Sequence, residues 1–129
     1  MKPIEEMTGL ELREAVAVEV MGYIKGERKR GEPEWLDPNM PVNRTVSSLY
    51  RGMMPLRGSL PAYESSIEAA FALVEKMREK GWRMILDNCG GAWECEMFLD
   101  SPSDARVFGI DDTAPLAIAR ASLKAVRAK

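Results

Sequence analysis

A segment near the middle of the chain has the residue types of an anion-binding site. Between Pro38 and Tyr63 the sequence contains no aspartate and no glutamate. The same segment contains three arginines and several hydroxyl side chains, namely Arg44, Thr45, Ser47, Ser48, Tyr50, Arg51, Arg57 and Ser59. An arginine presents a planar fork of N–H donors that suits phosphate and carboxylate groups, and nearby hydroxyls can complete such a site. The segment therefore predicts a site for a small anionic ligand of the nucleotide type.

The same arginines have a simpler interpretation, which stays open. They could pair with carboxylates elsewhere in the protein or face water, as surface arginines commonly do.

Four aromatic side chains could stack on the base of such a ligand. Trp82 and Trp93 fall on the apolar side of predicted strands, so packing in the core explains them. Trp35 and Tyr50 lie in the same irregular part of the chain as the arginines. We therefore expect Trp35 and Tyr50 to be the aromatic residues that contact the ligand.

The side chains that most catalytic sites need are missing. The sequence contains no histidine, which excludes Ser-His-Asp and Cys-His nucleophile systems and most zinc or iron sites. Glu94 and Glu96 could share one face of a strand and act as acid and base, or could simply face solvent. Cys89 has no visible base to activate it. We expect a protein that is not an enzyme and has no metal or other cofactor, although a carboxylate site for Mg²⁺ or Ca²⁺ is not excluded.

The bulk composition is that of a single globular domain spanning residues 1–129. The chain is 46% hydrophobic and 29% charged, with a net charge of −2. That balance lacks the basic bias of proteins that bind duplex nucleic acid. No apolar run is long enough to span a membrane, and the N-terminus does not resemble a signal peptide. We expect a cytoplasmic protein with Cys89 and Cys95 reduced, and the bridge between them as the alternative.

Three helices are predicted, near residues 10–21, 66–80 and 113–127. Capping boxes formed by Thr8 with Glu11 and by Ser65 with Glu68 mark the first two starts. Asp112 or Thr113 caps the third. Gly22 and Gly81 end the first two helices.

A β-hairpin is predicted at residues 82–99. Apolar and polar residues alternate on both sides of the turn Asn88-Cys89-Gly90-Gly91, which is the pattern of two antiparallel strands with one apolar face. A third, short strand is expected at about 106–109. Because a three-stranded sheet has open edges, we also expect a homodimer or larger oligomer.

The region from about residue 25 to 62 shows no regular periodicity and holds five of the eight prolines. Its apolar residues argue against a disordered linker. We interpret it as a long insertion folded over the domain, with a short strand or helical turn near 45–50.

Several ordered motifs resemble the phage alpha-beta-alpha (ABA) sandwich family of small phage and prophage proteins. They are Thr8-Gly9-Leu10-Glu11-Leu12, Val20-Met21-Gly22-Tyr23, Tyr63-Glu64-Ser65-Ser66, the run from Val74 to Gly81, and the run from Asp112 to Ile118. The resemblance covers roughly residues 8–24 and 63–127. It implies a three-layer helix-sheet-helix sandwich of the α/β (α+β) class with a small antiparallel sheet, and it carries over no binding residues.

Two functions from different classes fit these observations. The first is a non-enzymatic phage accessory protein that sequesters a small anionic nucleotide-type signal used in host defence. The second is a protein-interaction module that docks on a host or phage protein through Met40, Met53, Met54 and Leu56. An enzyme using Glu94 and Glu96 is a third possibility.

Overall fold

The computed structural model describes residues 3–7, 9–29, 32–37, 54–55, 60–99 and 105–128. The chain divides into two compact units, one of residues 1–21 with 61–129 and the other of residues 22–60. The expected insertion, 25–62, stays a prediction. That the whole chain folds as one domain stays a prediction.

The first unit contains three helices and a three-stranded antiparallel sheet, which confirms the expected α+β class. The helices are α1 (Gly9–Glu19), α2 (Ile67–Glu79) and α3 (Ala114–Arg127), preceded by a short 3₁₀ helix η1 (Ile4–Glu6). The strands are β4 (Trp82–Cys89), β5 (Ala92–Leu99) and β6 (Arg106–Asp111), in the order β4-β5-β6. The first and last residues of each helix lie within two residues of the predicted ones. The hairpin at 82–99 is confirmed, and the third strand is two residues longer than expected.

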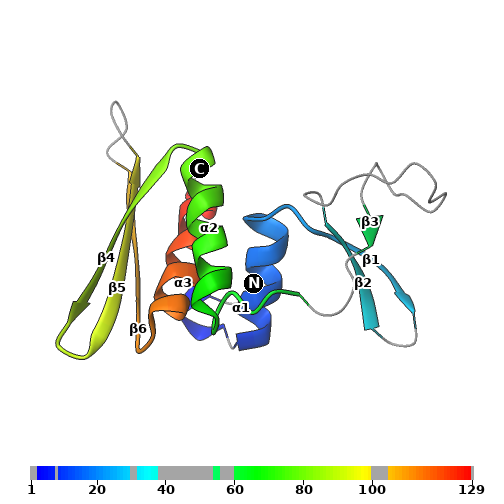
Figure 1. Ribbon diagram of the computed structural model, residues 1–129, viewed down its shortest axis with the longest axis horizontal. Helices are drawn as coiled ribbons and strands as arrows, with labels where there is room; N and C mark the ends of the chain where they lie inside the picture. Colours follow the sequence, from blue (N-terminus) through cyan, green and yellow to red (C-terminus); the bar gives the residue numbers. More distant parts are fainter. Residues whose placement is uncertain are drawn as a thin grey trace. The chain divides into compact units, whose positions relative to one another are not determined.

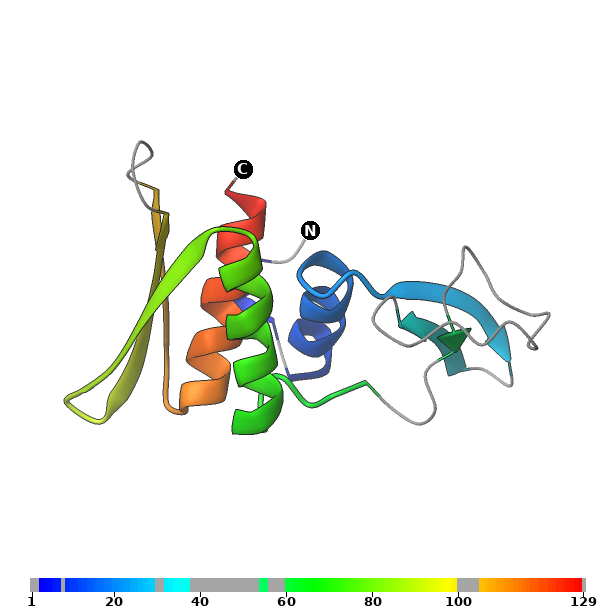
Figure 2. The same cartoon turned by 45° about the horizontal axis from the view of Figure 1, so that its top comes forward.

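The helices are layered on one side of the sheet. Figures 1 and 2 show α2 and α3 side by side against one face of the sheet, with α1 beyond them and away from the strands. The contacts agree, because α3 packs on β5 and β6, α2 packs on β4, and α1 packs on α3. Within the described residues, no helix lies against the other face of the sheet.

The helix starts differ in detail from the sequence prediction. Ser66, rather than Ser65, caps α2, and its hydroxyl accepts a hydrogen bond of 3.3 Å from the Ala69 N–H. The expected capping box of Ser65 with Glu68 is therefore wrong. Thr113 stands at the cap position of α3 but makes no capping hydrogen bond through its side chain. Thr8, which was expected to cap α1, lies outside the described residues.

Helix α3 is the centre of the core. Seven of its fourteen residues are buried, and five of those are small: Ala117, Ile118, Ala119, Ala121, Ser122, Leu123 and Ala125. Small side chains let neighbouring backbones approach closely. The closest approach is at Gly109 of β6, where an added Cβ would lie 2.1 Å from the Ala117 carbonyl oxygen. Glycine is therefore required at position 109 by space alone.

The inner face of the sheet packs against these helices. Cys95 and Met97 on β5 are fully buried, and the Ser122 hydroxyl lies 3.8 Å from the Met97 sulfur. Cys95 is a free thiol, so the bridge to Cys89 does not form. Burial raises the pKa of the Cys95 thiol to about 12, which keeps it protonated and unreactive at neutral pH.

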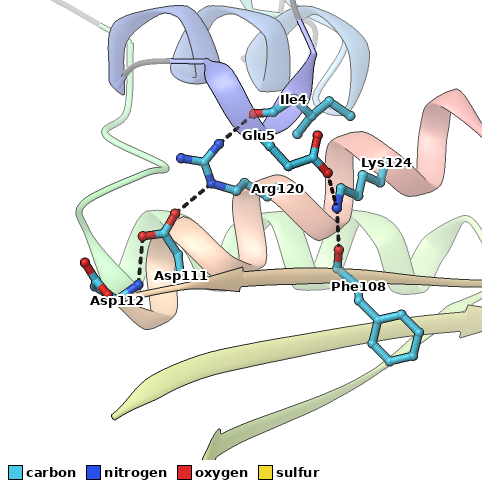
Figure 3. Close-up of polar contacts among 7 residues, drawn as sticks. All are labelled: Ile4, Glu5, Phe108, Asp111, Asp112, Arg120 and Lys124. Carbon is cyan, nitrogen blue, oxygen red and sulfur yellow. Dashed lines mark hydrogen bonds and ion pairs between the residues drawn. The ribbon is translucent and has the colours of Figure 1, made fainter. Parts of the chain in front are cut away.

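Arg120 of α3 ties the end of β6 to the N-terminal segment (Figure 3). Its Nε donates to Asp111 Oδ2 at 2.7 Å, and its Nη1 donates to the Ile4 carbonyl oxygen at 2.6 Å. Asp111 Oδ1 also accepts from the Asp112 backbone N–H at 2.7 Å. Asp111 thus pairs chiefly with an arginine of α3 and orders the turn that leads into that helix.

Lys124, one turn further along α3, makes a second connection of the same kind (Figure 3). Its Nζ lies 2.8 Å from the Phe108 carbonyl oxygen and 2.6 Å from Glu5 Oε1. The hydrogen bond from Lys124 lowers the pKa of Glu5 below its ordinary value. Arg120 and Lys124 therefore each bind η1 and β6 at once.

A bidentate ion pair joins α1 to the segment before α2. Arg13 Nε and Nη2 donate to Glu64 Oε1 and Oε2 at 2.9 and 2.7 Å. Glu64 is buried, and burial by itself would raise its pKa. The hydrogen bond and charge of Arg13, with a backbone hydrogen bond, outweigh burial and leave the pKa of Glu64 below its ordinary value.

The second unit contains a small antiparallel sheet that the sequence did not predict. Its strands are β1 (Ile24–Lys29), β2 (Glu32–Asp37) and β3 (Met54–Pro55), in the order β1-β2-β3. A bulge between Lys25 and Arg28 shifts the register and breaks the alternation that identifies a strand from sequence. The expectation of irregular structure is wrong for these residues. The strand or turn expected at 45–50 lies outside the described residues.

Replacing Gly109 with alanine should destabilise the protein by about 3 kcal/mol or more, because the new methyl group would overlap the backbone of α3. Urea denaturation measures the loss. Gly9→Ala is the matched control, since a Cβ there would meet only the Glu64 side chain, at 3.5 Å. A change within about 1 kcal/mol for Gly109→Ala would contradict the close packing of β6 on α3.

Glu64 should make stability depend on pH. Its pKa is lower in the folded than in the unfolded protein, so its contribution is complete above about pH 4.5 and is lost as the pH falls through the folded pKa. Glu64→Gln should cost about 1–2 kcal/mol at pH 7 and flatten the fall in stability between about pH 5 and 3. The measurement is the free energy of unfolding across that range. Adding Arg13→Gln to Glu64→Gln should lower the free energy of unfolding little further. If the double variant instead lost the sum of the two single losses, the two residues would not be coupled.

Candidate functional site

Seven of the eight expected ligand-binding residues lie outside the described part of the chain, namely Arg44, Thr45, Ser47, Ser48, Tyr50, Arg51 and Arg57. Their role in binding stays a prediction. The same is true of the methionines and the leucine at 40, 53, 54 and 56 as a docking surface.

Trp35, the eighth residue, lies on β2 and is buried. The Lys25 ammonium on the neighbouring strand sits 5.7 Å from the centre of the indole ring, which is a cation–π contact. One side of the ring is thus covered by a lysine of the same unit. Stacking of a ligand on Trp35 stays a prediction and would have to use the rest of the ring.

A groove of about 440 Å³ runs beside the start of β4. It is lined by two residues of α2, four of β4 and one of β5: Val74, Arg78, Trp82, Arg83, Met84, Ile85 and Phe98. The lining is apolar except for the two arginines. Packed helices lie about 8–10 Å apart and strands about 4.8 Å apart, so two helices cover about four strands. The sheet of this unit has three, which leaves α2 over an open strand edge and accounts for the groove.

The surface of α2 continues the apolar lining of this groove. Ile67, Phe71 and Val74 follow one another at helical spacing and lead to Arg78. Ile67 and Phe71 are exposed, whereas Ala70, Leu73 and Met77 form the buried side of the helix. Helix α2 therefore has a wide apolar face, of which neighbouring elements cover only a part.

Trp82 is an unusual member of the groove wall. Its side chain is buried, and its Nε1–H has no hydrogen-bond acceptor among the described residues. A buried donor without a partner typically costs about 1–3 kcal/mol. The expectation that Trp82 packs in the core is correct, but its polar atom is left unsatisfied.

The outer face of the sheet, the one away from the helices, forms a second candidate surface. The pairing of the strands arranges nine residues of this face in three rows that each cross β4, β5 and β6. The rows are Arg83, Phe98 and Arg106; Ile85, Glu96 and Phe108; and Asp87, Glu94 and Ile110. The exposed fractions of Ile85, Phe108 and Ile110 are 51%, 41% and 60%. An antiparallel sheet that faces only water usually carries polar residues on that side, so these apolar side chains are out of place on a solvated face.

Glu94 and Glu96 do share this face, as their spacing predicts. Glu96 Oε1 accepts a hydrogen bond of 2.7 Å from Arg106 Nη1, and the Arg106 guanidinium also lies 5.4 Å from the centre of the Phe98 ring. The carboxylate of Glu96 is therefore engaged in an ion pair with the adjacent strand. This arrangement stabilises the sheet and gives no sign of an acid–base pair aimed at a substrate.

No group of three or more histidine, cysteine, aspartate or glutamate side chains in the described part of the chain could hold a metal ion. None of the helices described is long and apolar enough to cross a membrane.

Sequence reasoning missed Arg78 and Arg83 as site residues. Arg78 belongs to a helix whose other charged residues face water, and Arg83 alternates with apolar residues on a strand. Only the pairing of α2 with β4, which no local pattern reveals, brings the two side chains to one groove. The sequence shows only that Arg78 precedes and Arg83 follows Gly81, the glycine that ends the helix.

Comparison with known proteins bears on the fold and not on either surface. No curated protein and no solved structure matches the chain. The phage ABA sandwich domain matches residues 14–123, which spans α2, the six described strands and the larger parts of α1 and α3. The protein therefore belongs to the phage ABA sandwich domain family.

Proposed function

We propose that this small phage protein binds an anionic ligand of the nucleotide type and releases it unchanged. The observation that carries the proposal is the groove beside β4, which joins two guanidinium groups to an apolar lining. Its volume of about 440 Å³ falls within the range of about 300–1,000 Å³ that is usual for sites of small molecules.

The groove residues suit the two halves of a nucleotide-type ligand. Arg78 and Arg83 supply fixed positive charge and several N–H donors for phosphate oxygens. Val74, Met84 and Phe98 supply apolar surface for a base or another aromatic ring. Trp82, whose buried N–H has no acceptor among the described residues, lies in the wall of the same groove.

Binding without conversion is the role that the composition favours. The chain has no histidine, and the carboxylate of Glu96 is held by Arg106. A phage protein that binds a nucleotide tightly and does not alter it would remove that molecule from use by the host. Sequestration of a host defence signal is the form of this function that we propose.

The arginines at 44, 51 and 57 belong to the same proposal as a second possible location. They lie in the acid-free segment between residues 38 and 63, whereas Arg78 and Arg83 lie in the first unit. Variants of the two sets can be compared directly, so the ligand's location is open to experiment.

A screen of cyclic and ADP-ribose-derived nucleotides should find compounds that raise the melting temperature by several degrees, because a ligand that binds only the folded state stabilises it. Arg78→Ala should abolish most of that shift. Lys80→Ala is the matched control, since it removes a nearby exposed cation that does not line the groove. Chromatography of the compound released by heat should show it unchanged.

Three outcomes would decide against parts of this proposal. Loss of the shift in a triple Arg44, Arg51 and Arg57 alanine variant, but not in Arg78→Ala, would move the site to the second unit. A chemically altered ligand would indicate an enzyme. The absence of a shift with every nucleotide tested would contradict nucleotide binding.

A protein-interaction module is the second candidate function. The observation that favours it is the outer face of the sheet, where three large apolar side chains are 41–60% exposed. A surface of this kind marks a contact with another macromolecule more often than a solvated face.

A further inference from the structure

The outer face of the sheet carries opposite charges at its two ends. The first row contains Arg83 and Arg106, and the third row contains Asp87 and Glu94. The middle row presents Ile85 and Phe108, both exposed. A partner for this face needs an acidic end, an apolar centre and a basic end, arranged in the reverse order.

A second copy of the same face meets that requirement. When two identical sheets pack face to face, their twofold axis lies between them, and it can run across the strands or along them. An axis across the strands reverses the order of the rows, so that Arg83 of each copy meets Asp87 of the other, while Arg106 meets Ile110 and Glu94 meets Phe98. We propose that the protein forms a homodimer through the outer faces of its sheets, with the twofold axis across the strands at the middle row.

The strand register identifies the facing residues. Each strand then lies over its own counterpart, so Arg83 of one copy faces Asp87 of the other on β4. The axis passes through the middle row, and Ile85 packs on Ile85 of the second copy. Phe108 does the same on β6. Glu96 also meets its own counterpart, but each Glu96 is already paired with Arg106 of its own chain at 2.7 Å.

The alternative axis, along the strands, is unfavourable. It would keep the order of the rows and place β4 over β6, so that Arg83 would face Arg106 and Glu94 would face Glu94 of the other copy. Like charges placed opposite each other across an interface cost several kcal/mol. Charge alone therefore selects one of the two face-to-face arrangements.

The interface is small, which sets the expected strength. Three strands and five residues along each strand cover about 14 Å by about 17 Å. That footprint is well below the roughly 800 Å² per partner of a standard stable interface. The dimer should therefore be weak, with a dissociation constant in the micromolar range or above, and should weaken further as salt rises.

The test is sedimentation equilibrium of the full chain from about 1 µM to about 1 mM, at low and high salt. The wild-type protein should pass from 14.4 kDa towards twice that mass. Arg83→Asp and Asp87→Arg should each weaken self-association by about tenfold or more, because each places like charges opposite one another. Circular dichroism melts show whether each variant is folded.

The decisive arm mixes the two single variants. Arg83→Asp carries two acidic residues on β4, and Asp87→Arg carries two basic ones, so the mixture should form a heterodimer although each variant alone is mainly monomeric. The double variant, Arg83→Asp with Asp87→Arg, should recover the wild-type affinity to within about threefold. A wild-type protein that stays monomeric to about 1 mM would overturn the proposal. So would single variants that associate as well as wild type, because the contact would then use another surface.

The dimer face shares Arg83, Ile85 and Phe98 with the lining of the groove, but the two proposals can be tested separately. Asp87 does not line the groove, so Asp87→Arg tests self-association without touching the residues proposed to hold the ligand. If the protein dimerises as described but no nucleotide raises its melting temperature, the dimer stands and nucleotide binding is rejected. If a nucleotide raises the melting temperature but the protein stays monomeric, nucleotide binding stands and the dimer is rejected.

Discussion

The close packing of α3 against β6 is the interaction on which the rest of the first unit depends. The alanine-rich surface of α3 lets it contact β5, β6, α2, α1 and η1 together. At Gly109 the strand lies so near the helix that a Cβ would meet the Ala117 carbonyl oxygen. Because burial of apolar surface is the main source of stability, a helix that supplies buried residues to so many neighbours determines where each of them lies. Arg120 and Lys124 of α3 then tie η1 and β6 to the same helix.

One consequence is that every helix of this unit is used on the same side of the sheet. Helix α1 packs on α3 instead of on the strands, so the outer face keeps Ile85, Phe108 and Ile110 exposed. Another consequence is the open edge of β4, where two helices extend over a sheet of only three strands and leave a groove. Both candidate surfaces, the groove and the outer face, therefore follow from how the helices are distributed. Neither depends on a catalytic side chain.

Local patterns were enough to predict the helices and the hairpin. Glycines with positive φ at 22, 81, 90 and 91 stand where the sequence places the helix ends and the hairpin turn, and alternation in 82–99 gives the correct faces. The cap of α2 was missed by one residue, because Ser65 and Ser66 are adjacent and only the backbone geometry decides between them. The hairpin of β1 and β2 was missed because a bulge and Pro33 obscure its alternation. The groove could not be predicted, since it depends on the packing of α2 beside β4, which is a tertiary contact.

Native-state hydrogen exchange of the backbone amides tests the central role of α3 most directly. The amides from Ile118 to Leu123 should exchange only through global unfolding, with a free energy equal to that from urea denaturation. The outward-facing amides of the β4 edge should exchange much faster in the monomer, since no strand pairs with them there. If α3 exchanged at a lower free energy than the sheet or α2, the helix would not be the element that holds this unit together.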